Sequence, residues 1–273
     1  MLDRFNKDAS FLKDKKLFLL DMDGTIYNEN TLFEGTIDFL RLIEENSGRY
    51  IFITNNSSKS VKDYVKKVNN MGIPADEESF FTSAQATALH INKHHNGKVV
   101  YCVGTESLKA ELLSFGIPLC DTVQEAEVLL IGYDTELTYE KLRKASEILF
   151  TKDVPYIATN PDKGCPTEFG LVPDCAGFCE MFYMITGKRP LYIGKPAPTM
   201  INYVMEKYKN TPEETVVVGD RLYTDIASGI NAGVTAVCVL SGEATLEDVM
   251  DSEVKPSLTL DSIRDISAII RGE

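Results

Sequence analysis

Short apolar runs alternate with helical patterns along nearly the whole chain, and this alternation restricts the fold more than any other feature. The stretches 61–68 and 201–208 place apolar residues at the spacing of one helix face. The runs contain few polar residues, as expected for strands of a sheet buried on both faces. Strands and helices alternating in this way predict a parallel α/β architecture. The runs lie at 17–20, 50–53, 98–103, 128–131, 155–158, 191–193, 215–218, 234–239 and 257–260.

Length and composition allow one large hydrophobic core or two modest ones, since 44% of the 273 residues are hydrophobic. The formal net charge of −13 makes nucleic acid and anionic membranes poor partners, because both are bound through Lys and Arg. No apolar run reaches the length of a membrane span, and the first residues carry no apolar signal core. We therefore expect a cytoplasmic protein that binds neither nucleic acid nor membrane, with its six cysteines as free thiols.

Three histidines, His90, His94 and His95, lie in one short segment. His90 and His94 are spaced to share a helix face, but no other type of metal ligand stands nearby. The pattern favours an exposed helix over a zinc site.

The middle third of the chain has strand and helix patterns of its own, opening near 82–84 and closing near 186–190. Insertion of one domain into a loop of another is well tolerated, because chain ends often lie close together. We predict a first core segment at 1–82, an inserted domain at 83–186 and a second core segment at 187–273.

Polar residues directly follow four of the apolar runs. Because ligands bind at the carboxyl ends of the strands in open α/β sheets, these residues are expected to meet if the strands are neighbours. The set contains four carboxylates, a hydroxyl and a lysine. Its members are Asp21 and Asp23, Thr54 with Asn55 and Asn56, Lys195, and Asp220 with Asp225.

This set suits phosphoryl transfer. Asp21 can act as a nucleophile, and Asp23 can protonate the leaving oxygen and later deprotonate water. Asp21 and Asp220 can share a Mg²⁺ ion, which prefers oxygen ligands. Thr54 and Lys195 can bind phosphoryl oxygens. Asp225 can support the metal from outside its ligand shell or orient Lys195. Gly24, which follows Asp23, allows a tight turn that brings backbone amides near the phosphate.

Taken singly, each motif has a plainer explanation. The segment around Asp21 and Gly24 has the composition of a turn, and so does Gly219-Asp220. Thr54 alone is typical of a helix N-cap, and Lys195 alone of a surface loop. The joint occurrence of all four motifs, in order, favours the phosphoryl-transfer interpretation.

The four motifs together resemble those of the haloacid dehalogenase superfamily of aspartate-nucleophile phosphohydrolases. They read Asp21-Met-Asp-Gly-Thr25, Thr54-Asn-Asn56, Gly194-Lys-Pro196 and Gly219-Asp-Arg-Leu-Tyr-Thr-Asp225. The long interval between Thr54 and Lys195 is similar to the branch with an inserted α/β C2-type cap. Ala158-Thr-Asn-Pro-Asp162 and Pro166-Thr-Glu-Phe-Gly-Leu-Val-Pro173 resemble the p-nitrophenyl phosphatase-like and nucleotide monophosphatase-like members, subfamily IIA.

The resemblance implies a Rossmann-like parallel core with that cap. It implies Asp21 as nucleophile, Asp23 as acid and base, and Thr54 and Lys195 as phosphate contacts. Mg²⁺ would bind Asp21, the backbone carbonyl of Asp23, and Asp220. Residues 26–35 would form a mobile segment that couples to cap closure.

The residues that select the leaving group are harder to assign. Candidates for contacts to the substrate are Asn55, Asn56, Asn160 and Asp162, and the alternative for Asn160-Pro-Asp162 is an Asx-Pro turn without a ligand role. Phe169, Phe178 and Tyr183 can line a ring-binding floor, although aromatic residues here are more often core.

The predicted function is a Mg²⁺-dependent phosphatase that hydrolyses small phosphomonoesters, such as sugar phosphates or nucleoside monophosphates, through an aspartyl-phosphate. Alternatives are a phosphomutase of the same superfamily, a receiver-like module that accepts phosphate, and a binding protein without catalysis. The expected partner is a small phosphorylated metabolite. The oligomeric state stays open, with a homodimer among the options.

Overall fold

The computed structural model describes residues 1–167 and 169–273. These residues form two compact units: the first comprises Met1–Thr54, Lys62–Phe81 and Lys195–Glu273, and the second Asn55–Val61 and Thr82–Gly194. The second unit therefore continues past the predicted end of the inserted domain at 186 and includes a short segment after Thr54. Glu168, part of the cap-like motif, lies outside the described residues.

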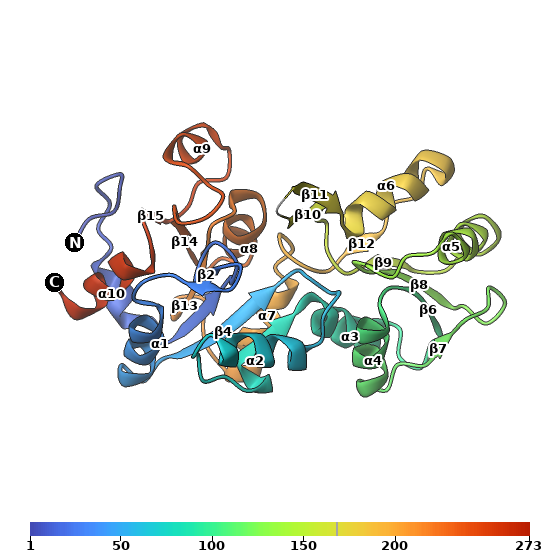
Figure 1. Cartoon of the computed structure of the whole chain (residues 1–273), viewed down its shortest axis with the longest axis horizontal. Helices are drawn as coiled ribbons and strands as arrows, with labels where there is room; N and C mark the ends of the chain where they lie inside the picture. The colour runs from blue at the N-terminus through green and yellow to red at the C-terminus, as the bar shows by residue number, and fades with distance from the viewer. Residues whose placement is uncertain (168) are drawn as a thin grey trace. The chain divides into compact units, whose positions relative to one another are not determined.

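The first unit is built on a six-stranded sheet with the strand order β15-β14-β13-β1-β4-β5 (Figure 1). The registered neighbours run parallel, and β1 lies between β13 and β4. Every residue of β1 and β13 is buried, as the lack of polar residues in these runs predicts. The strands span Leu17–Leu20 (β1), Arg49–Thr54 (β4), Phe80–Thr82 (β5), Thr215–Gly219 (β13), Thr235–Val239 (β14) and Leu258–Leu260 (β15).

Helices and two short strands surround this sheet. In α10, Ile263, Ile266 and Ile269 recur at helical spacing and are buried, and Ser262 caps the amino end. The other elements are η1 (Ser10–Asp14), β2 (Tyr27–Asn28), β3 (Thr31–Leu32), α1 (Thr36–Glu45), α2 (Val61–Asn70), η2 (Glu77–Ser79), α7 (Thr199–Tyr208), η3 (Leu222–Ile226), α8 (Ala227–Asn231) and α9 (Leu246–Asp251), with α10 at Ile263–Arg271.

The second unit has its own five-stranded parallel sheet, ordered β12-β9-β8-β6-β7. Its core includes the fully buried Leu129 and Ile131 of the central strand, together with Phe178 and Phe182 from a covering helix. The strands span Val100–Val103 (β6), Leu119–Cys120 (β7), Val128–Ile131 (β8), Tyr156–Ala158 (β9) and Leu191–Tyr192 (β12).

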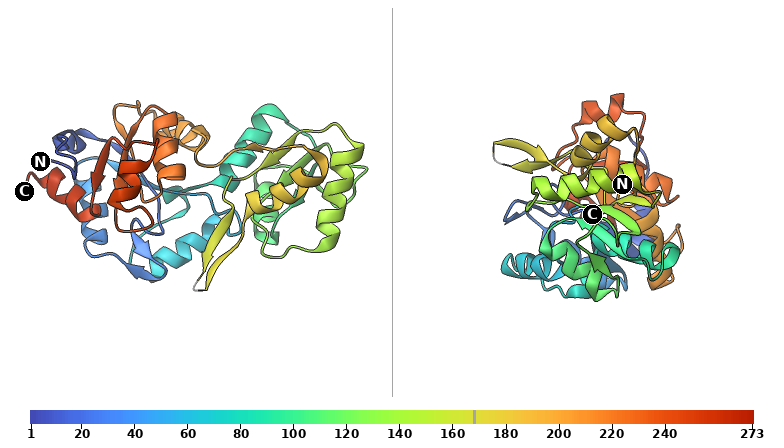
Figure 2. Two further views of the ribbon diagram at one scale, coloured as in Figure 1. Left: turned by 90° about the horizontal axis from the view of Figure 1, so that it is seen from above. Right: turned by 90° about the vertical axis from the view of Figure 1, so that its right-hand side faces the viewer.

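The helices of the second unit begin at capping side chains. Thr82, Thr105, Thr138 and Asp174 each accept a hydrogen bond from a backbone amide of the helix that follows. An antiparallel strand pair, β10 (Gly164–Thr167) and β11 (Gly170–Pro173), extends away from the five-stranded sheet in both views of Figure 2. The helices span Ser83–His94 (α3), Glu106–Ser114 (α4), Tyr139–Thr151 (α5) and Cys175–Thr186 (α6).

The predicted parallel α/β class is confirmed, and each of the predicted runs contains a strand. The helical stretches 61–68 and 201–208 are α2 and α7. The sequence patterns missed β5 and β7, which have only three and two residues, and the antiparallel pairs β2–β3 and β10–β11. Runs this short carry no readable periodicity. All six cysteines are thiols and none is joined in a disulfide bond. Among the described helices, none has the length and apolar character needed to cross a membrane.

Candidate active site

Asp21 stands directly after β1, at the carboxyl end of the central part of the sheet. Its backbone amide donates a hydrogen bond to the carbonyl of Val218, 2.9 Å away, which continues the pairing of β1 with β13 beyond the last strand residue. The backbone of Asp21 is therefore held by the sheet, and its carboxylate points beyond the strand end.

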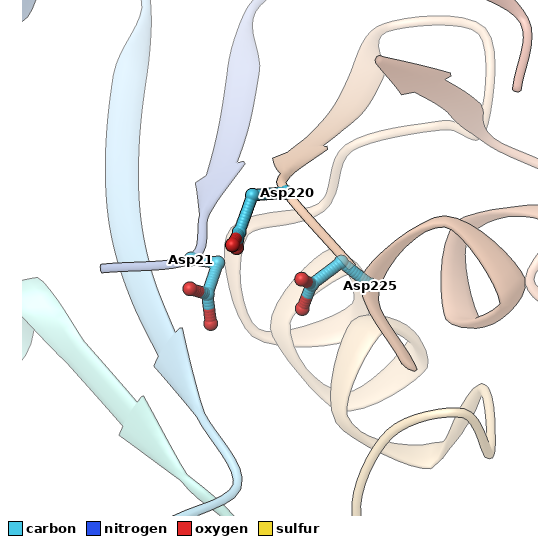
Figure 3. A group of neighbouring side chains, drawn as sticks. All are labelled: Asp21, Asp220 and Asp225. Atoms are coloured by element: carbon cyan, nitrogen blue, oxygen red, sulfur yellow. The ribbon is translucent and has the colours of Figure 1, made fainter. Parts of the chain in front are cut away.

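Asp21, Asp220 and Asp225 form one cluster of carboxylates (Figure 3). Each offers an oxygen atom, and these oxygens all lie within 4.8 Å of one another. Asp220 follows β13, and Asp225 lies in η3, so the strand-end prediction brings these three residues together as expected.

Lys195 joins two members of this cluster, although the strand before it, β12, belongs to the five-stranded sheet of the second unit. The expectation that all four strand ends come from one sheet is therefore wrong for Lys195. Its Nζ atom donates to Asp21 Oδ1 at 2.6 Å and to Asp225 Oδ1 at 2.5 Å. It also donates to the carbonyl of Ile53 in β4, at 3.3 Å. The lysine side chain is 3% exposed, so its buried ammonium lies between two carboxylates, of which Asp21 is still partly exposed.

Asp220 has one occupied and one unoccupied oxygen. Oδ2 accepts a hydrogen bond of 2.8 Å from the backbone amide of Glu243, whereas buried Oδ1 has no hydrogen-bond partner among the described residues. A Cβ atom at Gly24 or Gly242 would overlap this carboxylate, and Gly24 has a φ of +86°. Glycine at position 24 thus serves both the turn and the close approach of Asp220.

Both oxygens of Asp225 are occupied within the protein. Oδ1 accepts from Lys195, and Oδ2 accepts from the backbone amide of Arg221 at 3.1 Å. A Cβ atom at Gly219 would overlap the Asp225 side chain, so that glycine leaves the space Asp225 occupies. This arrangement suits a residue that orients Lys195.

Burial and mutual repulsion shift the titration of the cluster. Burial, and next the charge of Asp225, raise the pKa of Asp21 to about 8 although Lys195 opposes the shift. The same two causes raise the pKa of Asp220 to about 6. Burial lowers the pKa of Lys195, but the charges of Asp21 and Asp225 outweigh it, so the pKa of the ammonium is raised. Three carboxylates with one lysine leave a site that favours a further cation.

The residues fit a divalent metal ion. Asp21 and Asp220 supply oxygen ligands of the kind Mg²⁺ prefers, and Asp220 Oδ1 has no hydrogen-bond partner in the described part of the chain. Asp225 is the poorer direct ligand, because Lys195 and Arg221 already hold both its oxygens.

Asp23 and Thr54 complete the predicted set in the first unit. Asp23 is exposed, in the loop after β1, where the backbone amide of Gly24 donates to the carbonyl of Tyr27. Thr54 is the last residue of β4 and is buried. The alternative interpretation of Thr54 as a helix N-cap is wrong, because the next helix begins only at Val61.

The predicted substrate contacts Asn55, Asn160 and Asp162 belong to the second unit, where they bond to one another. Asn160 is fully buried; its amide donates to the carbonyl of Asn55 at 2.8 Å, and its Oδ1 accepts from the backbone amide of Asp162 at 3.0 Å. The latter bond is an Asx turn, the alternative considered for this motif. This geometry gives no support to a direct substrate contact by Asn160.

Asn56, the other predicted contact in this unit, accepts from the backbone amide and the hydroxyl of Ser58. Among the aromatic candidates, Phe178 belongs to the core, whereas Phe169 is exposed.

The sequence reasoning missed the segment Ser241–Glu243, which follows β14. The hydroxyl of Ser241 donates to the carbonyl of Gly24 at 2.7 Å, and the amide of Glu243 holds Asp220. Inspection of the residues after the run at 234–239 would have found it, by the rule that identified the other four segments.

The three histidines lie at the end of α3 and just beyond it, with the rings of His90 and His94 4.5 Å apart. Among the described residues, Asp21, Asp220 and Asp225 are the group of three or more side chains with metal-ligand geometry. The structure thus gives no support to a zinc site at the histidines.

The parallel sheet, the strand-end aspartate and its lysine partner indicate a hydrolase with a parallel α/β core, whose acidic centre suits a metal ion. The chain belongs to the haloacid dehalogenase-like hydrolase family. Residues 18–118 match the family described as haloacid dehalogenase-like hydrolase, and residues 192–266 match the related HAD-hydrolase-like family.

Curated and solved relatives agree with this membership. The chain is 33% identical to 5'-nucleotidase YutF of Bacillus subtilis, over 92% of this chain and 97% of the relative. It is 32% identical to the acid sugar phosphatase of Staphylococcus saprophyticus, over 93% and 98%. The crystal structure of 4-nitrophenylphosphatase from Thermotoga maritima is similar with a TM-score of 0.90 and 38% identity, covering 95% of this chain and 99% of that one.

Proposed function

We propose that this hydrolase removes phosphate from small phosphomonoesters, with Asp21 as its nucleophile. The observation that carries the proposal is the buried Lys195, held between Asp21 and Asp225 at the end of the central strands. The relatives named above are phosphatases and a nucleotidase, which supports a phosphoric monoester hydrolase.

In the first step, a carboxylate oxygen of Asp21 attacks phosphorus and the bond from phosphorus to the ester oxygen breaks. Lys195 offsets charge on the transferred group, while Asp225 keeps the lysine in position. Asp23 gives its proton to the leaving oxygen, so that the alcohol departs neutral. The product on the enzyme is an aspartyl-phosphate.

In the second step, Asp23 takes a proton from water, and the water oxygen attacks phosphorus. The bond between phosphorus and the Asp21 oxygen breaks, which releases inorganic phosphate and restores the carboxylate. Asp23 is exposed, so both the leaving group and water can reach its carboxyl group. This access suits a residue that exchanges protons with each of them.

Asp21, Asp220 and the backbone carbonyl of Asp23 would hold Mg²⁺, with Asp225 acting through Lys195. When bound, the ion supplies positive charge that offsets the carboxylates and the incoming phosphate. The raised pKa values of Asp21 and Asp220 support the need for that charge.

Two further parts of the proposal follow from family membership. The second unit is a C2-type cap inserted into the core, and residues 26–35, which contain β2 and β3, form a mobile segment whose movement couples to cap closure. The cysteines are thiols without disulfide bonds, which supports the cytoplasm as the compartment of this protein.

The test is phosphate release during multiple turnover on p-nitrophenyl phosphate, followed by a panel of sugar phosphates and nucleoside monophosphates. A phosphatase releases many equivalents of phosphate per enzyme. Release of a single equivalent of p-nitrophenol, with the phosphoryl group retained on the protein, would indicate a receiver-like module. An isomerised phosphoester would indicate a phosphomutase, and no reaction on any substrate would indicate a binding protein. Each of these three results would overturn the proposal.

A further inference from the structure

Three segments of the second unit lie side by side where β9 ends. The backbone amide of Gly194 donates to the carbonyl of Thr159 at 2.8 Å. The hydroxyls of Ser57 and Thr159 lie 2.9 Å apart, and both residues are fully buried. The segments 55–57, 159–162 and 193–194 are thus linked to one another inside the unit.

Asn160 joins two of these segments through one side chain. Its amide donates to the carbonyl of Asn55, and its Oδ1 accepts from the backbone amide of Asp162. A side-chain amide supplies both the donor and the acceptor that this arrangement needs. Asp at this position would lose the donated bond, and Leu would lose both bonds. Asn160 is fully buried, and the carbonyl of Asn55 also accepts from the hydroxyl of Ser83, so the loss of the Asn160 amide removes chiefly the link between the segments 55–57 and 159–162.

Asn55 and Gly194 close the arrangement. The Asn55 amide donates to Asp162 Oδ1 at 3.1 Å. A Cβ atom at Gly194 would lie 2.5 Å from Asn55 Oδ1 and 2.8 Å from the carbonyl of Thr159, which is closer than real Cβ contacts. Glycine therefore allows the third segment to reach the other two.

Two of the bonded residues are direct neighbours of the predicted phosphate contacts along the chain. Asn55 directly follows Thr54, and Gly194 directly precedes Lys195. Within the first unit, Lys195 also donates to the carbonyl of Ile53, the residue before Thr54. The bonded carbonyl of Asn55 and the bonded amide of Gly194 thus each lie one peptide group away from a predicted phosphate contact, and Asn160 and Thr159 link them in one hydrogen-bonded network.

We propose that Asn55, Asn160, Asp162 and Gly194, here termed the crossover clasp, position Thr54 and Lys195 for phosphoryl transfer. This inference rests on the proposed function. Asn160 and Asp162 act through the chain and do not read the leaving group. The clasp therefore affects every substrate to the same degree, whereas a residue that contacts the leaving group affects some substrates more than others.

The first test replaces Asn160→Asp, which retains the acceptor and removes the donor. Asn92→Asp is the matched control, since the half-buried Asn92 donates in the same way to the carbonyl of Phe115, at 2.9 Å, elsewhere in this unit. We expect kcat of the Asn160 variant to fall about 10- to 100-fold on p-nitrophenyl phosphate, by the same factor on every other accepted phosphomonoester, with KM little changed. The control stays within about twofold of the wild type.

The second test exchanges the partly buried pair and does not depend on Asn160. Asn55→Asp alone sets two carboxylates against each other and lowers kcat. Adding Asp162→Asn restores a hydrogen bond of opposite polarity and recovers most of that loss. Circular dichroism and thermal midpoints of all variants identify any loss that comes from unfolding.

The outcomes separate this inference from the proposed function. Inactivity of the wild type on every phosphomonoester would refute the function. If the wild type is active and the loss of kcat in the Asn160 variant differs between substrates, Asn160 contacts the leaving group. If the Asn160 and Asn92 variants have the same kcat, Asn160 has no role in positioning. If the Asn160 variant does not fold, failure of the double exchange to restore kcat overturns the clasp.

Discussion

The two compact units both gather polar groups where parallel strands end, but they bury different kinds of group. The first unit buries Lys195 with the charged Asp220 and Asp225. At the end of β9 the second buries neutral side chains, among them Ser57 and Asn160, and its buried Asp134 and Asp174 are each bonded within the unit, to Lys141 and to the amide of Cys175. Burying a neutral amide costs less desolvation free energy than burying an ion. Residues that only had to hold the backbone in place would therefore be expected to be neutral. In the first unit three carboxylates share one lysine, and Asp220 Oδ1 has no hydrogen-bond partner among the described residues, so these charges point to chemistry.

The contrast also sets the expected size of mutational effects. Breaking a buried ion pair leaves an uncompensated charge, whereas removing one neutral hydrogen bond costs about 1–3 kcal/mol when a partner is left unpaired. The predictions below start with the charged unit and end with a comparison of buried hydroxyls in both units.

The largest effect is expected for Asp21→Asn. The amide is a poor nucleophile, so phosphate release should fall by at least about 10³-fold, while the circular dichroism spectrum stays unchanged. Asp38→Asn is the control, because Asp38 is 63% exposed on α1 and should leave the rate within about twofold. Substantial phosphate release by a pure preparation of the Asp21 variant would exclude Asp21 as the nucleophile.

Removal of divalent cations should have the next largest effect. Treatment with EDTA is expected to lower the rate at least about 10²-fold, and added Mg²⁺ should restore it. The thermal midpoint provides a second readout, because an ion that binds the folded state raises it. That rise should be present in the wild type and in Asp38→Asn, and should disappear in Asp220→Asn. Full activity in EDTA would contradict the metal assignment.

Lys195→Met tests the ion pairs directly. The variant leaves Asp21 and Asp225 without their shared counter-charge, so we expect a loss of about 3–5 kcal/mol in the free energy of unfolding. The rate should fall about 10²-fold through the loss of phosphate stabilisation. Lys207→Met is the matched control in the same unit, since its pair with Glu78 is exposed and worth under about 1 kcal/mol. Similar losses in the two variants would remove the distinction between buried and exposed pairs.

Much of the charged site could be predicted from the sequence, because of one rule of topology. Parallel strands of one sheet deliver their carboxyl ends to the same edge, so Asp21, Asp220 and Asp225 could be expected to meet before their distances were known. Lys195 is the exception, because it follows β12, a strand of the five-stranded sheet of the second unit. The structure brings these four together. Their catalytic roles stay predictions.

The neutral network of the second unit could not be predicted in this way. A buried amide such as Asn160 carries no signature of its partner, because the bond to Asn55 joins residues 105 positions apart. The same holds for the amide of Glu243, since every residue except proline has a backbone donor. Residue type predicts chemistry at strand ends, whereas hydrogen bonds between distant segments depend on tertiary packing.

The smallest effects should come from two buried threonines that differ in their bonding. Thr159 lies in the second unit and shares a hydrogen bond with Ser57, whereas Thr259, on β15 of the first unit, has no partner for its hydroxyl among the described residues. Thr159→Val should lower the free energy of unfolding by about 1–2 kcal/mol, because Ser57 loses a partner. Thr259→Val should leave the free energy unchanged or raise it, because an unpaired buried hydroxyl is replaced by a methyl group.

Urea denaturation of the two valine variants measures this difference. Both substitutions keep the β-branched shape of the side chain, so the comparison reports the bonds of the hydroxyl, which at Thr159 join Asn160 and Cys175 as well as Ser57. If Thr259→Val costs as much as Thr159→Val, the loss comes from packing around the new methyl group. The hydrogen-bond network of the second unit would then be stabilised mainly by packing. The two units would differ only in the contribution of their ion pairs to stability.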